Sequence, residues 1–234
     1  MIHFENVEIG YKKPLIKVEN LTLELGVIYA LVGRNGSGKS TLLRSINGQI
    51  SLLKGDLKIN HFSIKTLNTK EKSRTVAFVE SKFDGVPFLT VENYLALGRA
   101  PYTNPLGRLN TSDWEVVKRV ANEIGIANFL KKETVSLSDG ERQLCAIARA
   151  IVQETNIILL DEPSAFLDYA NKQLLIDKLI QIAEEKQKCI LFSTHDLDLC
   201  IENKIEFLTL SNNSLTKTSC QSKKDLIAIL EGKI

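Results

Sequence analysis

The stretch Gly33–Thr41 (GRNGSGKST) has the residue types and spacing of a loop that binds phosphate. It fits the pattern G-x-x-x-x-G-K-[ST], follows an apolar segment and precedes a helical pattern that begins at Ser40. Glycines permit backbone conformations closed to other residues, so consecutive N–H groups can converge on one anion at the positive end of the helix. The expected phosphate contacts are Gly33, Asn35, Gly36, Ser37, Gly38, Lys39, Ser40 and Thr41.

Three side chains of this loop have distinct expected roles. Lys39 supplies a point charge for the β- and γ-phosphates, Ser40 offers a hydroxyl to Mg²⁺, and Thr41 can reach the α-phosphate. The alternative is a glycine-rich turn with an incidental lysine. Because strand, spacing and helix occur together, the sequence favours a site for a nucleoside triphosphate with Mg²⁺.

Two adjacent carboxylates follow a second apolar segment, in the sequence IILLDE of residues 157–162. In open α/β sheets, ligands bind at the carboxyl ends of the strands. Asp161 is placed to hold the Mg²⁺ shell, through water, and Glu162 is the candidate base that orients the attacking water. The alternative is a strand-terminating turn with solvated charges before Pro163.

His195 follows the apolar segment CILFS, in the sequence STHD. At the end of a strand, its imidazole can donate a hydrogen bond to a γ-phosphate oxygen. The alternative is a capping or packed histidine. His3 and His61 lack this context, so we interpret them as structural or surface residues.

Apolar patterns along the chain predict the elements that position these residues. Strands are expected at 2–6, 17–25, 27–32, 76–79, 157–160 and 190–193. Helices are expected from Ser40 and at 90–97, 113–124, 141–152 and 223–230. Strands that alternate with helices indicate an α/β fold with a largely parallel sheet.

Composition excludes several other classes of protein. The 234 residues are 44% hydrophobic and 25% charged with a net charge of +2, which is typical of a globular domain. Apolar runs are too short to span a bilayer, and no secretory signal is visible. No basic face indicates nucleic acid as a partner. The four cysteines lack CxxC spacing, so we expect reduced thiols, with Cys145 and Cys189 packed as small hydrophobes.

Residues Leu137–Gln143 (LSDGERQ) resemble the signature LSGGQ-[RQ]-Q of ABC-type ATPases, and they lie between the loop and the carboxylates, as in that family. Asp168 resembles the D-loop aspartate and His195 the switch histidine. Tyr11 occupies the place of the aromatic residue that stacks on adenine, although a tyrosine after Gly10 is also a common turn residue.

The resemblance covers the whole chain and implies its architecture. It implies a single domain over 1–234 with a P-loop NTPase (RecA-like) core, an N-terminal antiparallel β subdomain and a helical insertion. The core is expected at 1–85 and 153–234, and the helical subdomain at about 86–152.

The resemblance also implies a mechanism and partners. Ser138 and Gly140 would cap the γ-phosphate of ATP held by the loop of a second copy, so two ATP molecules are sandwiched in a homodimer. Further implied partners are a membrane permease and, indirectly, a substrate-binding protein. The implied location is cytoplasmic, on the inner face of the membrane.

The segment Val91–Asp113 resembles the corresponding segment of iron-chelate importers, which carry siderophores, haem or cobalamin. Matching residues are Gly98, Arg99, Pro101, Tyr102, Gly107 and Arg108. The alternative is that these residues are shared by cassettes of many substrate classes.

One family position departs from its usual residue. Aligning VAFVES, residues 76–81, with the family places Glu80 at the proline and Ser81 at the Q-loop glutamine, which reaches Mg²⁺. Serine is too short for that reach, so water, Glu80 or a backbone group would have to replace it, or hydrolysis is slow. Asp139 and Glu141 also depart from the signature, and we expect both to be tolerated.

The sequence therefore predicts an ATPase that powers import of an iron chelate or cobalamin. One alternative is a cassette for another substrate or for export. Another is a soluble ABC protein that uses ATP as a dimerisation switch, which the lack of a coiled-coil insertion, second cassette or basic arm disfavours.

Overall fold

A ten-stranded mixed sheet runs through the described part of the chain, in the order β5-β4-β1-β2-β10-β9-β3-β8-β7-β6. The computed structural model describes residues 1–104, 106–219, 222–231 and 233. The strands are β1 (Ile2–Gly10), β2 (Pro14–Leu23), β3 (Ile28–Gly33), β4 (Lys54–Ile59), β5 (Phe62–Ser63), β6 (Val76–Val79), β7 (Ile157–Leu160), β8 (Cys189–Ser193), β9 (Glu206–Ser211) and β10 (Ser214–Thr218).

The strands that carry the candidate site are parallel to one another. β3 pairs in parallel with β8 and β9, and β7 pairs in parallel with β6 and β8. β3, β7 and β8 are buried at every position, as expected of strands covered on both faces. Their carboxyl ends consequently meet at one edge, which is where the sequence placed the phosphate loop, the two carboxylates and His195.

The N-terminal strands form the predicted antiparallel part of the sheet. β1 pairs with β2 and β4, and β4 pairs with β5. β1 continues past the predicted end at Asn6, because Asn6 adopts φ 48° near a register shift that breaks the alternating pattern. β2 ends at Leu23 rather than at Leu25, and Gly26 turns the chain with φ 80°.

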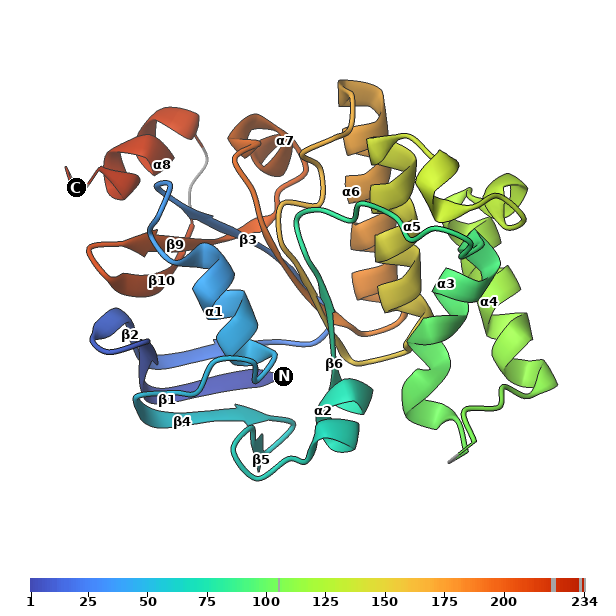
Figure 1. Cartoon of the computed structure of the whole chain (residues 1–234). Helices are drawn as coiled ribbons and strands as arrows, with labels where there is room; N and C mark the ends of the chain where they lie inside the picture. Colours follow the sequence, from blue (N-terminus) through green and yellow to red (C-terminus); the bar gives the residue numbers. More distant parts are fainter. Residues whose placement is uncertain (105, 220–221, 232, 234) are drawn as a thin grey trace.

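Helices cover both faces of the sheet and gather densely at one side (Figure 1). They are α1 (Lys39–Ile46), α2 (Thr69–Thr75), α3 (Val91–Ala96), η1 (Leu97–Tyr102), α4 (Thr111–Ile124), η2 (Ala127–Phe129), η3 (Thr134–Ser136), α5 (Asp139–Val152), α6 (Tyr169–Glu185), α7 (Leu197–Glu202) and α8 (Lys223–Leu230), where η denotes a 3₁₀ helix. α3, α4 and α5 lie on the side of the molecule opposite β1 and β2 (Figure 1).

Most predicted elements are present with small changes of boundary. α8 has the predicted bounds, and α3 ends at Ala96, where the chain tightens into η1. The sequence patterns do not predict β4, β5, β9, β10, α2, α6 or α7. In α6, apolar residues such as the exposed Leu174 also occur on the outer face, and this weakens the helical period.

Two buried clusters fill the space on either side of the sheet. One joins α3, α4, α5 and α6 to the parallel strands, and the other joins β1, β2 and α1 to the opposite face. Cys145 and Cys189 are buried in them as predicted, and burial raises the pKa of both thiols to about 12. Cys220 lies outside the described residues. Among the described helices, none combines the length and apolarity needed to cross a bilayer.

Candidate nucleotide site

The glycine-rich loop connects the end of β3 to the start of α1. Gly36 adopts φ 76° and Gly38 φ 106°, backbone conformations that side chains rarely permit. A Cβ on Gly38 would lie 2.8 Å from Leu15 Cδ2, so β2 packs tightly beneath the loop. The strand, loop and helix therefore occur in the order and with the conformations that an anion cradle requires.

The side chain of Lys39 is buried within this loop. Its Nζ donates hydrogen bonds to the carbonyl oxygens of Gly33, at 3.0 Å, and Arg34, at 3.4 Å. Burial lowers the pKa of Lys39, while the negative charges of Glu162 and Asp161 act in the opposite direction. The loop follows β3 and the carboxylates follow β7, and β8 pairs in parallel with both strands, so the loop and the acidic strand end share one site.

A cavity of about 450 Å³ borders the loop. It is lined by loop residues 34–37, by Leu15, by the turn after β9 and by the end of α8. Tyr11 lies in the turn between β1 and β2, four residues before Leu15, and is 70% exposed. Adenine stacking on Tyr11 stays a prediction.

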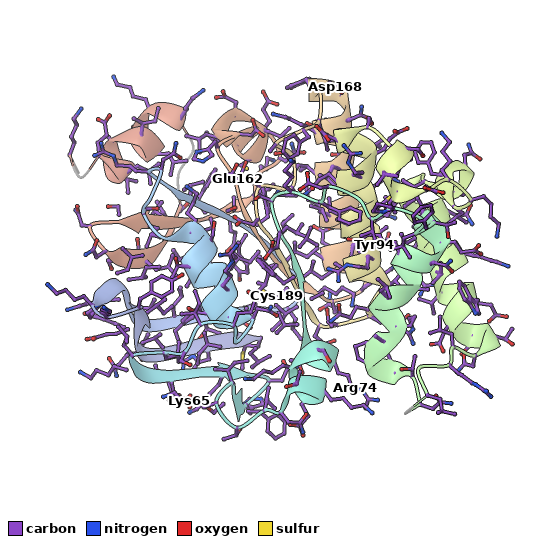
Figure 2. The ribbon with its side chains drawn as sticks, in the orientation of Figure 1. Lys65, Arg74, Tyr94, Glu162, Asp168 and Cys189 are labelled. Carbon is purple, nitrogen blue, oxygen red and sulfur yellow. The ribbon has the colours of Figure 1, made fainter. Side chains whose placement is uncertain are left out.

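Asp161 and Glu162 leave the end of β7 in different environments. Asp161 is buried, and its Oδ1 accepts a hydrogen bond of 2.6 Å from Ser193 Oγ. Glu162 is half-buried and adopts φ 47°, which is uncommon for a residue with a side chain. Figure 2 shows Glu162 in the upper half of the molecule and Cys189, at the start of β8, in the lower half. Glu162 therefore lies at the carboxyl edge of the parallel strands.

His195 faces Glu162 from the loop after β8. Its Nε2 lies 3.1 Å from Glu162 Oε1. The next residue, Asp196, accepts hydrogen bonds from Ser164 Oγ at 2.7 Å and Lys172 Nζ at 3.0 Å. Asp196 thus anchors the histidine loop to the segment that follows the carboxylates and to α6. The predicted catalytic pair, Glu162 and His195, is in direct contact.

The donor set of this edge fits Mg²⁺. Ser40 at the start of α1 and Asp161 at the end of β7 provide oxygen donors, which this hard cation prefers. Among the described residues, no group of three or more His, Cys, Asp or Glu side chains could hold a metal by itself. Mg²⁺ sites in nucleotide-binding proteins use one or two protein oxygens with substrate phosphates and water, so two donors suffice here.

The signature segment Leu137–Gln143 forms the start of α5. Ser138 is the N-cap: its Oγ accepts from Glu141 N–H at 3.3 Å, and Glu141 Oε2 accepts from Ser138 N–H at 2.8 Å. This hydrogen bond from the Ser138 backbone is the main cause that lowers the pKa of Glu141. Glu141 completes a capping box here, as the family's glutamine can also do, and its tolerance stays a prediction.

Gly140 brings the signature close to the predicted D-loop of the same chain. A Cβ on Gly140 would lie 3.1 Å from Leu167 Cδ2 and 3.2 Å from Phe166 O. Asp168 follows as the N-cap of α6, and its Oδ1 accepts from Asn171 N–H at 2.9 Å. In Figure 2, Asp168 lies at the upper edge of the molecule, and Glu162 lies below it, still in the upper half.

The loop and the signature of one chain lie far apart. The starts of α1 and α5 occupy opposite halves of the molecule in Figure 1. Among the residues that the structure describes, the cavity at the loop has no lining residue from Leu137–Gln143. The structure therefore does not bring Ser138 and Gly140 to the phosphate loop of their own chain.

Ser81, at the predicted Q-loop position, is exposed two residues after the end of β6. Its neighbour Glu80 lies 3.7 Å from the guanidinium of Arg44 on α1, at Oε1 and Nη2. Phe83, two residues further, stacks on Tyr94 of α3 with ring centroids 4.2 Å apart. Contacts of Glu80 and Phe83 thus hold the segment on either side of Ser81. The serine side chain itself is short, so it does not extend toward the carboxylates as a glutamine could.

The residues that suggested an iron-chelate importer have a structural role. Arg99 is buried and donates to Asp113 Oδ1 at 2.9 Å and Val152 O at 3.0 Å. Its guanidinium carbon lies 4.2 Å from the ring centroid of Tyr102, a cation–π contact. The motif therefore joins η1, α4 and the end of α5.

Sequence reasoning missed three residues around the candidate catalytic pair: Ser193, Asp196 and Ser164. Ser193 and Asp196 flank His195 in the sequence STHD, so their position beside a candidate histidine was a usable signal. The contact partners of Ser193 and Ser164 lie 32 residues away in sequence, and no local pattern reveals them.

Comparison with known proteins agrees with this geometry. Residues 16–165 match the family model described as ABC transporter. The chain is 34% identical over 217 residues to an ABC transporter ATP-binding protein of Methanocaldococcus jannaschii, covering 92% of this chain and 74% of the relative. It is 32% identical to the iron(3+)-hydroxamate import ATP-binding protein FhuC of Bacillus subtilis, over 83% of this chain and 72% of the relative.

A solved structure of a metal-chelate type ABC transporter in an inward-facing conformation superposes with a TM-score of 0.82 at 28% identity. The match covers 98% of this chain and 88% of the other. The predicted α/β fold with a P-loop NTPase core is confirmed by this similarity.

Proposed function

The chain belongs to the ABC transporter family as an ATP-binding subunit, and we propose that it hydrolyses ATP to power import of an iron chelate or cobalamin through a membrane permease. The name of the hydroxamate-importing relative supports the iron-chelate cargo. The metal-chelate type transporter with the same fold supports it as well.

In the proposed reaction, the glycine-rich loop binds the triphosphate. Lys39 leaves the carbonyl oxygens of Gly33 and Arg34 and pairs with the β- and γ-phosphates, a stronger charged contact. Thr41 contacts the α-phosphate, while Ser40 and Asp161 would hold Mg²⁺. When bound, this ion would neutralise charge on the phosphates.

Glu162 acts as the base that orients the attacking water and accepts its proton. The Nε2 of His195 lies 3.1 Å from Glu162 Oε1, and when ATP binds its N–H turns from this carboxylate to donate a hydrogen bond to the γ-phosphate. Positioned acid–base groups contribute about 10²–10⁴ in rate.

The observation that carries the proposal is the separation of loop and signature in one chain. Ser138 and Gly140 lie at the start of α5, whose N–H groups and dipole suit an anion, yet the glycine-rich loop before α1 lies in the other half of the molecule (Figure 1). In a dimer, the signature of the second copy lies opposite the glycine-rich loop of the first and caps the γ-phosphate of the ATP bound by that loop. Hydrolysis then removes the bridging charge, and the dimer opens.

We propose that the helical segment at about 86–152 receives the permease, and that 1–85 with 153–234 binds the nucleotide. The Q-loop segment joins these two parts at Ser81. Such a subunit works on the cytoplasmic face of the membrane, and a substrate-binding protein delivers the cargo on the other side.

The proposal is tested by copurifying the chain with candidate permeases from the same genome and reconstituting the complex in vesicles. We expect ATP hydrolysis that rises with a ferric siderophore, haem or cobalamin, together with uptake of that compound. A chain that hydrolyses ATP but binds none of the permeases would support the soluble switch instead. Stimulation of the complex by an unrelated cargo would indicate another transport branch.

A further inference from the structure

Ser193, the last residue of β8, has no exposed surface and contacts both carboxylate residues of the site. Its Oγ donates to Asp161 Oδ1 at 2.6 Å, and it accepts a hydrogen bond from the Glu162 N–H at 2.9 Å. We propose that Ser193 is a positioning residue for ATP hydrolysis, which sets the carboxylate of Asp161 and the backbone of Glu162 with one hydroxyl.

The two hydrogen bonds reinforce one another. A serine hydroxyl has one proton and two acceptor lone pairs. Because the Glu162 N–H approaches the oxygen as a donor, the serine proton is free to point at Asp161. The 2.6 Å separation is in the range of a charge-assisted O–H···O⁻ bond. This bond fixes Oδ1 and leaves the second oxygen of Asp161 as an acceptor for the metal shell.

The same contact supports the unusual backbone of Glu162. A residue with φ 47° persists only where its surroundings hold it there. Ser193 binds the N–H side of Glu162, and the Ala165 N–H donates to its carbonyl oxygen at 3.2 Å. The direction in which the Glu162 side chain leaves the strand, toward His195, therefore depends on the serine.

Ser193 also connects two parts of the mechanism through the fold. It lies on β8, which pairs in parallel with β7 and leads two residues later to His195. Replacing the serine would therefore change the position of both the candidate metal ligand, Asp161, and the candidate base, Glu162. Supporting residues around a metal site affect metal affinity or activity by about 10–100-fold.

The test compares Ser193→Ala with Ser193→Thr, which keeps a hydroxyl, and with Thr155→Val as a matched control. Thr155 is also fully buried, and its Oγ1 donates to Ile157 O at 2.8 Å near the start of β7, at the opposite end of that strand. The control therefore distinguishes the general effect of losing a buried hydroxyl from the specific effect of losing the Ser193 hydroxyl. Ser193→Cys, with a weak donor, replaces the alanine variant if that variant does not fold.

Three quantities are measured for each protein: the thermal midpoint, the kcat and KM for ATP, and Mn²⁺ binding by electron paramagnetic resonance with a non-hydrolysable ATP analogue. We expect Ser193→Ala to lower kcat and weaken Mn²⁺ binding by about 10–100-fold, with KM for ATP nearly unchanged. Ser193→Thr recovers most of both, and Thr155→Val changes only the thermal midpoint.

The proposal is overturned if Ser193→Ala melts earlier but keeps the wild-type kcat and Mn²⁺ affinity, because the serine is then only structural. An equal loss in Thr155→Val would overturn it too. The inference rests on the proposed ATP hydrolysis. If the wild-type chain hydrolyses no ATP, that function fails on its own, and Mn²⁺ binding alone decides the role of Ser193.

Discussion

His195 Nε2 and Glu162 Oε1 lie 3.1 Å apart, although 33 residues separate the two side chains along the chain. Parallel pairing of β7 and β8 produces this contact, because the segments that follow the two strands emerge at the same edge of the sheet. The candidate base and the candidate γ-phosphate ligand are therefore in direct contact.

His195→Ala should lower the ATP hydrolysis rate by about 10²-fold or more, because the γ-phosphate loses a donor. Affinity for ATP should change little. Phosphate release and binding of a fluorescent ATP analogue measure the two effects. His61→Ala, at an exposed histidine, is the control, and wild-type turnover of the His195 variant would reject its role.

Lys39→Ala should weaken ATP binding. The variant loses a charged hydrogen bond to phosphate worth about 1.5–3 kcal/mol, which corresponds to roughly 10–150-fold in affinity. Titration with ATP in a calorimeter measures the change, and Lys118→Ala on the exposed face of α4 is the matched control. Unchanged affinity in the Lys39 variant would contradict the phosphate cradle.

Ser81→Gln tests the Q-loop assignment. A glutamine side chain is long enough to reach toward the carboxylates, and one additional hydrogen bond in the active complex would raise the ATPase rate or its stimulation by permease by about tenfold. Lys82→Gln places the same side chain one residue further as a control. If neither rate nor stimulation changes, the Q-loop lies elsewhere in the chain.

The buried ion pair of Arg99 and Asp113 predicts a pH-dependent stability. Burial opposes ionisation of Asp113, but the Asn110 N–H and the Arg99 guanidinium outweigh it and hold the pKa of this carboxyl below its usual range. A lowered folded-state pKa contributes stability that is present above the unfolded pKa and is lost as pH falls through the folded pKa.

Asp113→Ala should therefore lower the free energy of unfolding at pH 7 by about 1–3 kcal/mol, because the buried Arg99 loses its buried partner and keeps only Glu154, at 2.7 Å, as a carboxylate partner. The difference from wild type should shrink as pH falls below about 4. Urea titrations across this range measure it, with Asp177→Ala on the exposed face of α6 as control. A pH-independent difference would show that the charge of Asp113 is not what stabilises the fold.

Local signals in the sequence predicted the parts of the site that are contiguous in the chain. The spacing of the glycines and Lys39 predicted the phosphate loop, because the positive φ angles of Gly36 and Gly38 require glycine at those positions. The helix predicted at 141–152 begins two residues earlier, at Asp139, because Ser138 and Glu141 form a capping box there. The apolar run before Asp161 similarly predicted β7, which is buried on both faces.

Contacts between distant segments were not predictable in the same way. The hydrogen bond between Ser193 and Asp161 depends on which strands are neighbours, and this order is set by the whole sheet. The packing of Arg99 was not predictable either: its motif indicated the iron-chelate branch, and only the structure shows that Arg99 also contacts Asp113 and Val152 O. The strands β9 and β10 lack a strong alternating pattern, since both faces of β9 are covered.

The central claim is that ATP is held jointly by the loop of one molecule and the signature of another. Glu162→Gln keeps the loop and the signature but removes the base, so bound ATP should persist and join two copies. With saturating Mg-ATP, light scattering should report twice the 26.2 kDa of the single chain, and Glu162→Gln with Ser138→Arg should remain single. A Glu162→Gln protein that binds ATP but stays at 26.2 kDa, even with its permease present, would contradict the account.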